Sequence, residues 1–161
     1  MQLVQDLEAT QAELEALEAP EQLRWANDHF GSGFAVTTSF GTQSAVLLHL
    51  LVAVAPDVPV YWIDTGYLFP ETYQYAADLT QRLKLNLKVV QPELSPARME
   101  ALLGRLWESE NPDDLVTYHR LRKVEPLDQA LDAAEVSCWA SGGRAGQTDN
   151  PAAMRPPERL R

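Results

Sequence analysis

Cysteine and long apolar runs are scarce in this 161-residue sequence, and each scarcity excludes a class of protein. The single cysteine, Cys138, cannot form a disulfide within the chain or a multi-cysteine metal site, and it fits a reducing compartment. The longest apolar stretch, residues 45–55, is interrupted by His49 and is far shorter than the roughly 20 residues that cross a bilayer. The N-terminal segment is acidic, whereas a signal peptide begins with basic residues. We therefore expect a cytoplasmic protein that does not enter a membrane.

Positively charged residues are also scarce. The sequence has 13 Lys and Arg against 23 Asp and Glu, for a net charge of -10. An acidic field of this size argues against a nucleic-acid or membrane-surface binder, so a small anionic ligand needs a local basic site. His29, His49 and His119 show no ligand spacing, and we expect no metal site. The length and a hydrophobic content of 45% suit one packed domain.

Short β-prone segments alternate with segments of helical length along the sequence. Residues 1–30 are predicted to form an N-terminal helical extension of two helices, residues 31–150 the main domain, and residues 151–161 a disordered tail. The predicted strands are residues 34–38, 58–63, 87–90 and 136–140. The predicted helices between them are residues 45–54, a helix from Pro70, residues 96–107 and residues 124–134, with a turn-rich break at 109–114. This order favours a doubly wound, mainly parallel α/β sheet that binds ligands at the carboxyl ends of its strands.

A polar loop follows the first predicted strand and contains Ser39, Gly41, Gln43 and Ser44. Small residues at this place let backbone amides approach an anion, and the N-terminus of the following helix adds partial positive charge. The loop is not a Walker A motif, because the Gly-Lys-Ser/Thr ending is absent. The pattern predicts either an anion cradle or an ordinary strand-to-helix turn capped by Ser or Thr.

Asp64, Thr65 and Gly66 follow the second predicted strand, which places them beside the first loop in a doubly wound sheet. Asp64 could hold a ribose hydroxyl or a metal ion, or it could cap the turn while Gly66 takes a positive φ. Two polar loops at matching strand ends favour a nucleotide site.

Arg120, Arg122 and Lys123 form the only basic cluster in the body of the sequence. They are either the positive patch that a multiply charged anion requires or the solvated start of a helix. Arg144 and Gln147 follow the fourth predicted strand and are placed to close the site from above.

Four segments closely resemble, in order and spacing, the phosphoadenosine phosphosulfate (PAPS) reductase family. They are residues 38–44 (TSFGTQS), 64–73 (DTGYLFPETY), 84–89 (KLNLKV) and 123–127 (KVEPL). The resemblance implies an adenine nucleotide alpha hydrolase-like fold. It also implies a thioredoxin- or glutaredoxin-dependent reduction of 3'-phosphoadenylyl sulfate (PAPS) to sulfite and adenosine 3',5'-bisphosphate (PAP), in sulfate assimilation and cysteine biosynthesis.

The resemblance assigns roles to the candidate residues. By analogy, the phosphosulfate is cradled by Ser39, Gly41, Gln43 and Ser44. The nucleotide pocket is lined by Asp64, Thr65 and Gly66, and the anionic groups are met by Lys123, Arg144 and Gln147.

The related reductases of adenylyl sulfate hold an iron–sulfur cluster on a Cys-Cys pair just before Arg-Lys. Here Tyr118 and His119 stand ahead of Arg122 and Lys123, so we expect no cluster and no other cofactor. The missing cluster favours the phosphorylated substrate, and the implied partners are PAPS or PAP and thioredoxin.

Two departures from the family pattern bear on activity. Family members attack the sulfur with a cysteine in a C-terminal Glu-Cys-Gly-Leu-His segment, which this sequence lacks, and Cys138 lies in an apolar strand segment where cysteine acts as a small hydrophobe. Gly142-Gly143-Arg144-Ala145 and Pro151 replace Gly-Leu-Arg-Arg and a later Arg. We therefore expect a truncated domain with its nucleotide-binding half and no catalytic residue.

Two alternatives stay open. The chain is a non-catalytic remnant or interaction module, or, less favoured, an ATP pyrophosphatase, whose loop reads Ser-Gly-Gly-Lys-Asp-Ser where this sequence has Phe40, Thr42 and Gln43. Loss of the later strands would leave an unpaired sheet edge, from which we expect a homodimer or aggregation.

Overall fold

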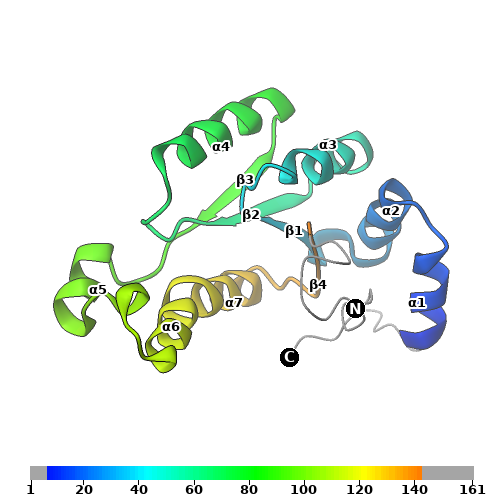
Figure 1. The fold of residues 1–161 in the computed structure, drawn as a ribbon. Coiled ribbons are helices and arrows are strands. Elements are labelled where there is room, and N and C mark those ends of the chain that lie inside the picture. The colour runs from blue at the N-terminus through cyan, green and yellow to red at the C-terminus, as the bar shows by residue number, and fades with distance from the viewer. Residues whose placement is uncertain (1–6, 143–161) are drawn as a thin grey trace.

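Four parallel strands form one sheet in the computed structural model, which describes residues 7–142 (Figure 1). They are β1 (Phe34–Thr38), β2 (Pro59–Ile63), β3 (Asn86–Val90) and β4 (Cys138–Ser141), in the order β3-β2-β1-β4. Val36 of β1 pairs with Val60 of β2 on one side and with Ala140 of β4 on the other. The predicted doubly wound parallel sheet is thus confirmed, and the chain changes its direction of winding between β3 and β4.

Helices cover both faces of this sheet. They are α1 (Leu7–Glu15), α2 (Ala19–Phe30), α3 (Ser44–Val54), α4 (Pro70–Leu83), α5 (Pro96–Leu103), α6 (Pro112–His119) and α7 (Glu125–Ala133). Figure 1 shows α2, α3 and α4 on one face and α7 on the other. In residues 7–142 no helix is both long enough and apolar enough to cross a membrane.

The two central strands are buried on both faces, as expected for strands of nearly continuous apolar sequence. Successive strand residues point to opposite faces, and this alternation divides the core in two. Phe34 and Val36 of β1 pack with residues of α2, α3 and α4, whereas Ala35 packs with Tyr61 of β2 and Leu131 of α7. Leu23 joins the first cluster, so the N-terminal helical extension is attached to the sheet through α2.

The helices after β3 differ from those predicted. The helix predicted over residues 96–107 ends at Leu103, because Gly104 takes a φ of +77°. The predicted break at 109–114 is shorter, since Asn111 caps α6 by accepting a hydrogen bond from the Asp113 amide (3.1 Å) and Pro112 occupies its first turn. α6 then continues into α7 through one π-helical turn, Arg120–Val124. The predicted tail, 151–161, lies outside the described residues.

Candidate functional site

A cleft of about 730 Å³ opens at the carboxyl ends of β1, β2 and β4. It is lined by the loop after β1, the end of β2 with Thr65, the exit of β4 and the segment that leads into α7. β1 lies between β2 and β4 in the sheet, so the loops after these strands diverge and leave a crevice at the topological switch point. Doubly wound folds bind their ligands at such a crevice.

The loop between β1 and α3 forms one side of the cleft, and Ser39, Gly41, Gln43 and Ser44 all line it. The Ser44 amide and hydroxyl both donate to the Gly41 carbonyl, at 2.9 Å and 2.5 Å, and these bonds close a tight turn. Helix α3 begins after Gln43 without a side-chain cap. A Ser or Thr cap, the second interpretation of the sequence, is therefore not formed at this helix, and its N-terminal dipole faces the cleft.

Phe40 anchors this loop from inside. It is 3% exposed and has a φ of +50°, which is strained for a residue with a bulky side chain. Its ring packs edge-on against Trp62, with 5.1 Å between centroids. Burial of the ring offsets the backbone strain and holds the neighbouring polar residues at the cleft. Sequence reasoning missed this role because the strain at Phe40 is set by tertiary packing.

The loop after β2 places only Thr65 of its three predicted residues in the cleft lining. The Asp64 carboxylate instead accepts hydrogen bonds from the Tyr73 hydroxyl (2.6 Å), the Gly66 amide (2.8 Å) and the Gln91 side chain (3.0 Å). Partial burial by itself would raise the pKa of the Asp64 carboxyl, but these hydrogen bonds and the charge of Arg122 outweigh it and lower the pKa. Asp64 ties together β2, α4 and the exit of β3, and Gly66 turns the chain at a φ of +77°.

The three cations of the predicted basic cluster point to three different places. Lys123 lines the cleft and is its one charged residue within the part of the chain that the structure describes. Arg122 is 1% exposed, and its guanidinium donates to the carbonyls of Thr65 and Leu94. Arg120 pairs with Glu125 at the surface (2.5 Å). Of the two interpretations of this cluster, a positive patch formed by all three residues is wrong, because neighbouring residues of a helical turn face different directions.

The remaining predicted residues follow β4. Arg144 and Gln147 lie outside the described residues, whereas Ser141 and Gly142 line the cleft. The apolar wall between these loops was not predicted, since apolar residues near strand ends resemble ordinary core. Its members are Leu47, Tyr61, Trp62, Ile63, Leu68 and Leu127.

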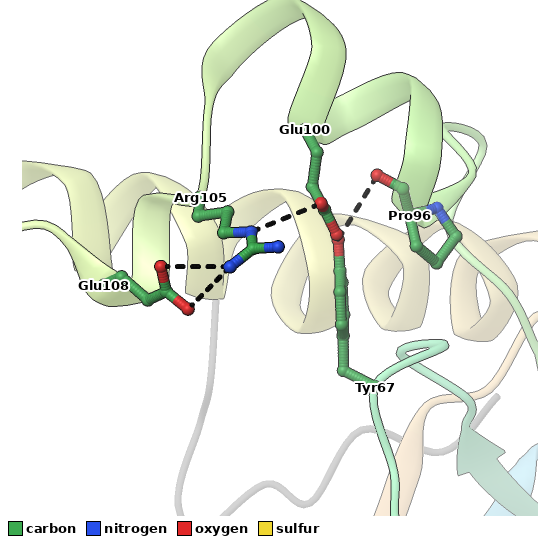
Figure 2. A network of polar contacts seen from close by, with 5 residues as sticks. All are labelled: Tyr67, Pro96, Glu100, Arg105 and Glu108. Carbon is green, nitrogen blue, oxygen red and sulfur yellow. Dashed lines mark hydrogen bonds and ion pairs between the residues drawn. The ribbon is translucent and has the colours of Figure 1, made fainter.

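Tyr67, in the loop after β2, points toward α5 (Figure 2). Its hydroxyl donates to Glu100 (3.0 Å) and lies 3.3 Å from the Pro96 carbonyl oxygen, while Arg105 bridges Glu100 and Glu108. Burial, and then the bond to Glu100, raise the pKa of Tyr67 to about 12, so its phenol stays protonated at neutral pH. This side of the β2 exit is therefore fixed by packing and hydrogen bonds.

Tyr118, one of the two positions that the resemblance compares with cluster cysteines, packs near Tyr67, with 6.2 Å between their ring centroids. Tyr118 lies edge-on to Trp107 with 5.7 Å between centroids, and Trp107 lies 4.4 Å from Tyr67. His119 lies beside Tyr118, with 5.6 Å between their ring centroids. Within residues 7–142, no group of three or more His, Cys, Asp or Glu is placed to hold a metal ion.

Gly66→Ala is expected to destabilise the protein more than Gly104→Ala. Both glycines have a φ of +77°, so both substitutions add backbone strain of about 1–3 kcal/mol. A Cβ at Gly66 would also lie 2.5 Å from Pro96 Cγ, whereas a Cβ at Gly104 meets nothing within 4 Å. Thermal unfolding of the two variants measures the difference, and equal losses would contradict close packing of the β2 exit against α5.

Alkylation of Cys138 is expected to be slow at neutral pH. The thiol lies at the start of β4, and burial raises its pKa to about 11, so the reactive thiolate is rare. The rate with iodoacetamide, followed by mass spectrometry, should rise about tenfold per pH unit between about pH 7 and 9. The urea-unfolded chain, with an ordinary thiol pKa of about 8.5, is the control. A rate in the folded protein that levels off by about pH 9.5, as that of an ordinary thiol does, would disagree with this burial.

The comparisons with known proteins agree on one family. The model of the family "Phosphoadenosine phosphosulfate reductase domain" matches residues 33–159. The phosphoadenosine 5'-phosphosulfate reductase of a Synechococcus species is 56% identical over 146 residues, which cover 91% of this chain and 63% of that protein. The reductase of a Synechocystis species is 50% identical, with coverage of 94% and 61%.

A solved structure agrees as well. The PAPS reductase of Candida auris, crystallised as a phosphate complex, matches with a TM-score of 0.77 and 31% identity, over 91% of this chain and 71% of that one. The chain spans about three-fifths of the length of these two curated relatives. The family match over most of its residues, together with this fold and cleft, shows that the chain belongs to the phosphoadenosine phosphosulfate reductase domain family.

Proposed function

We propose that the chain is the nucleotide-binding part of a thioredoxin-dependent phosphoadenylyl-sulfate reductase, and that its cleft binds PAPS and PAP. The observation that carries this proposal is the convergence of the Ser39–Ser44 loop, Thr65 and Lys123 on one cleft at the switch point of the sheet. Hydroxyls, backbone amides and one ammonium group are donors suited to the oxygens of phosphate and sulfate. The naming of the relatives as PAPS reductases, one of them solved with phosphate, supports the same substrate class.

The cleft also has an apolar surface, which suits the base of a nucleotide. Beside the polar loop lies the apolar wall of Leu47, Tyr61, Trp62, Ile63, Leu68 and Leu127. A purine ring can pack on such a wall while its phosphates meet the loop, as in mainly apolar pockets with a few polar groups. The net charge of the chain is -10, so Lys123 is the local positive charge that an anionic ligand requires.

The reaction proposed for the family requires two functions, which are binding of the nucleotide and nucleophilic attack on its sulfo group. A cysteine thiolate attacks the sulfur of the sulfo group, the sulfur–oxygen bond to the phosphate breaks, and PAP leaves. A thiolate of thioredoxin or glutaredoxin then attacks the cysteine sulfur, the sulfur–sulfur bond to the sulfo group breaks, and sulfite leaves. The second thiol of the reductant resolves the resulting mixed disulfide, so that the reductant ends as a disulfide and the cysteine is free again. These 161 residues hold one cysteine, Cys138, whose pKa of about 11 makes it a poor nucleophile. We therefore assign binding and orientation of the nucleotide to these residues, and no catalytic residue among them.

Tyr118 and His119 stand where the related adenylyl sulfate reductases have their cluster cysteines, and this favours PAPS as the substrate. Tyr118 and His119 cannot supply the cysteine thiolates that hold an iron–sulfur cluster. We propose that the chain works without a cluster, in the cytoplasm, as part of sulfate assimilation.

Isothermal titration of the folded chain with PAP tests the proposal. We expect saturable binding of PAP, weaker binding of AMP, which lacks the 3'-phosphate, and none of ATP with magnesium. Binding of ATP with magnesium in place of PAP would favour the pyrophosphatase alternative. Absence of any binding would favour a non-catalytic remnant or interaction module.

Lys123→Met is expected to weaken PAP binding about tenfold or more, because a lost charge-assisted contact costs about 1.5–3 kcal/mol. The salt dependence of binding should fall with it. Lys88→Met is the matched control, since Lys88 is exposed on β3 and does not line the cleft. Equal affinities of the two variants would show that Lys123 does not meet the anion.

A further inference from the structure

Arg122 and Thr65 are the two polar or charged residues that are buried in the described part of the chain, and they contact each other. Arg122 has the largest fully buried side chain there, at 1% exposure. A buried guanidinium is costly unless its donors are satisfied, so its partners reveal what it does.

Its partners are backbone groups from the exits of two strands. Arg122 Nε donates to the Thr65 carbonyl at 3.1 Å, and Nη2 donates to the same oxygen. Nη1 donates to the Leu94 carbonyl, and the guanidinium carbon lies 5.4 Å from the centroid of the Tyr67 ring. No carboxylate forms an ion pair with Arg122 within residues 7–142. The planar guanidinium group of Arg122 therefore joins the segment after β2 to the segment after β3.

The guanidinium group of Arg122 and the ring of Pro96 are closely packed against Gly66, which leaves no room for a side chain there. A Cβ on Gly66 would lie 3.3 Å from Arg122 Nη2 and 2.5 Å from Pro96 Cγ. The Thr65–Tyr67 segment is thus held by Arg122 on one side and by α5 on the other. Thr65 is the residue of this segment that lines the cleft, so its place there depends on the contacts of its own carbonyl.

Arg122 also influences the direction in which the side chain of Lys123 points. Arg122 and Lys123 share the π-helical turn Arg120–Val124, and π-turns occur often at functional sites. Since adjacent residues of a helical turn face different directions, an inward Arg122 leaves Lys123 facing the cleft.

We propose that Arg122 is a positioning residue, which holds Thr65 and Lys123 at the anion-binding cleft without touching the ligand itself. The inference rests on the proposed function for the nature of the ligand. Arg122 then maintains the geometry of the cleft, in addition to any contribution that it makes to stability.

The test compares Arg122→Lys and Arg122→Ala with Arg120→Met. Arg120 lies in the same turn and carries the same charge, but it is exposed and pairs with Glu125. Lysine retains the charge without the planar fork, so we expect both Arg122 variants to bind PAP about tenfold or more weakly while Arg120→Met binds as the wild type. Thermal unfolding of each variant, measured in parallel, identifies the folded ones, and Arg122→Lys serves if Arg122→Ala does not fold.

Chemical rescue separates positioning from general stability. Guanidinium chloride, at a concentration well below that which unfolds the protein, should restore PAP binding to Arg122→Ala, with sodium chloride at the same concentration as the control. It should not restore binding to Lys123→Met. Wild-type affinity in a folded Arg122 variant, or failure of guanidinium to improve binding by folded Arg122→Ala, would overturn the proposal.

Hydrogen exchange distinguishes failure of this inference from failure of the proposed function. If the wild type does not bind PAP, the function is wrong, but amides of residues 65–68 should still exchange faster in Arg122→Lys than in Arg120→Met. Unchanged exchange in this segment would show that Arg122 does not position it.

Discussion

All four strands of the sheet run parallel, and this alignment places both the helices and the cleft. It brings the carboxyl ends of the strands to one edge, and it requires a helical crossover after each strand that covers a face of the sheet. Because β2 and β4 flank β1, the exits of these strands diverge and leave a crevice. The cleft is thus a product of topology, and its lining residues are those that follow the strands.

Topology by itself does not hold polar loops in place, and here the contacts of three side chains do so. Phe40 inserts its ring beside Trp62 and fixes the loop after β1 at the cost of a positive φ. Asp64 gathers hydrogen bonds from α4 and the exit of β3, and the buried Arg122 binds two backbone carbonyls. Phe40 with Trp62, Asp64 with Gln91 and Arg122 with Thr65 each join segments far apart in the sequence. These contacts tie the polar groups at the cleft to distant parts of the fold.

The described lining of the cleft carries a positive charge, although the chain as a whole is negative. In a protein with a net charge of -10, Lys123 places a positive group among neutral hydroxyls and amides, which focuses the attraction of an anion on one place. Burial raises the pKa of Cys138 to about 11, so its reactive thiolate is rare at neutral pH. Binding is therefore the part of reductase chemistry that we propose for these residues.

The alternation of strands and helices, the two polar loops and the family could be predicted from the amino-acid sequence, because hydrophobic periodicity and local motifs are patterns along the chain. Which of two neighbouring residues faces the cleft follows from tertiary contacts. Thr65 lines the cleft while Asp64 accepts hydrogen bonds from α4 and the exit of β3, and Lys123 lines it while Arg122 is buried. Adjacent residues point in different directions, and the choice between them depends on long-range contacts such as that of Arg122 with Leu94, which no local pattern encodes.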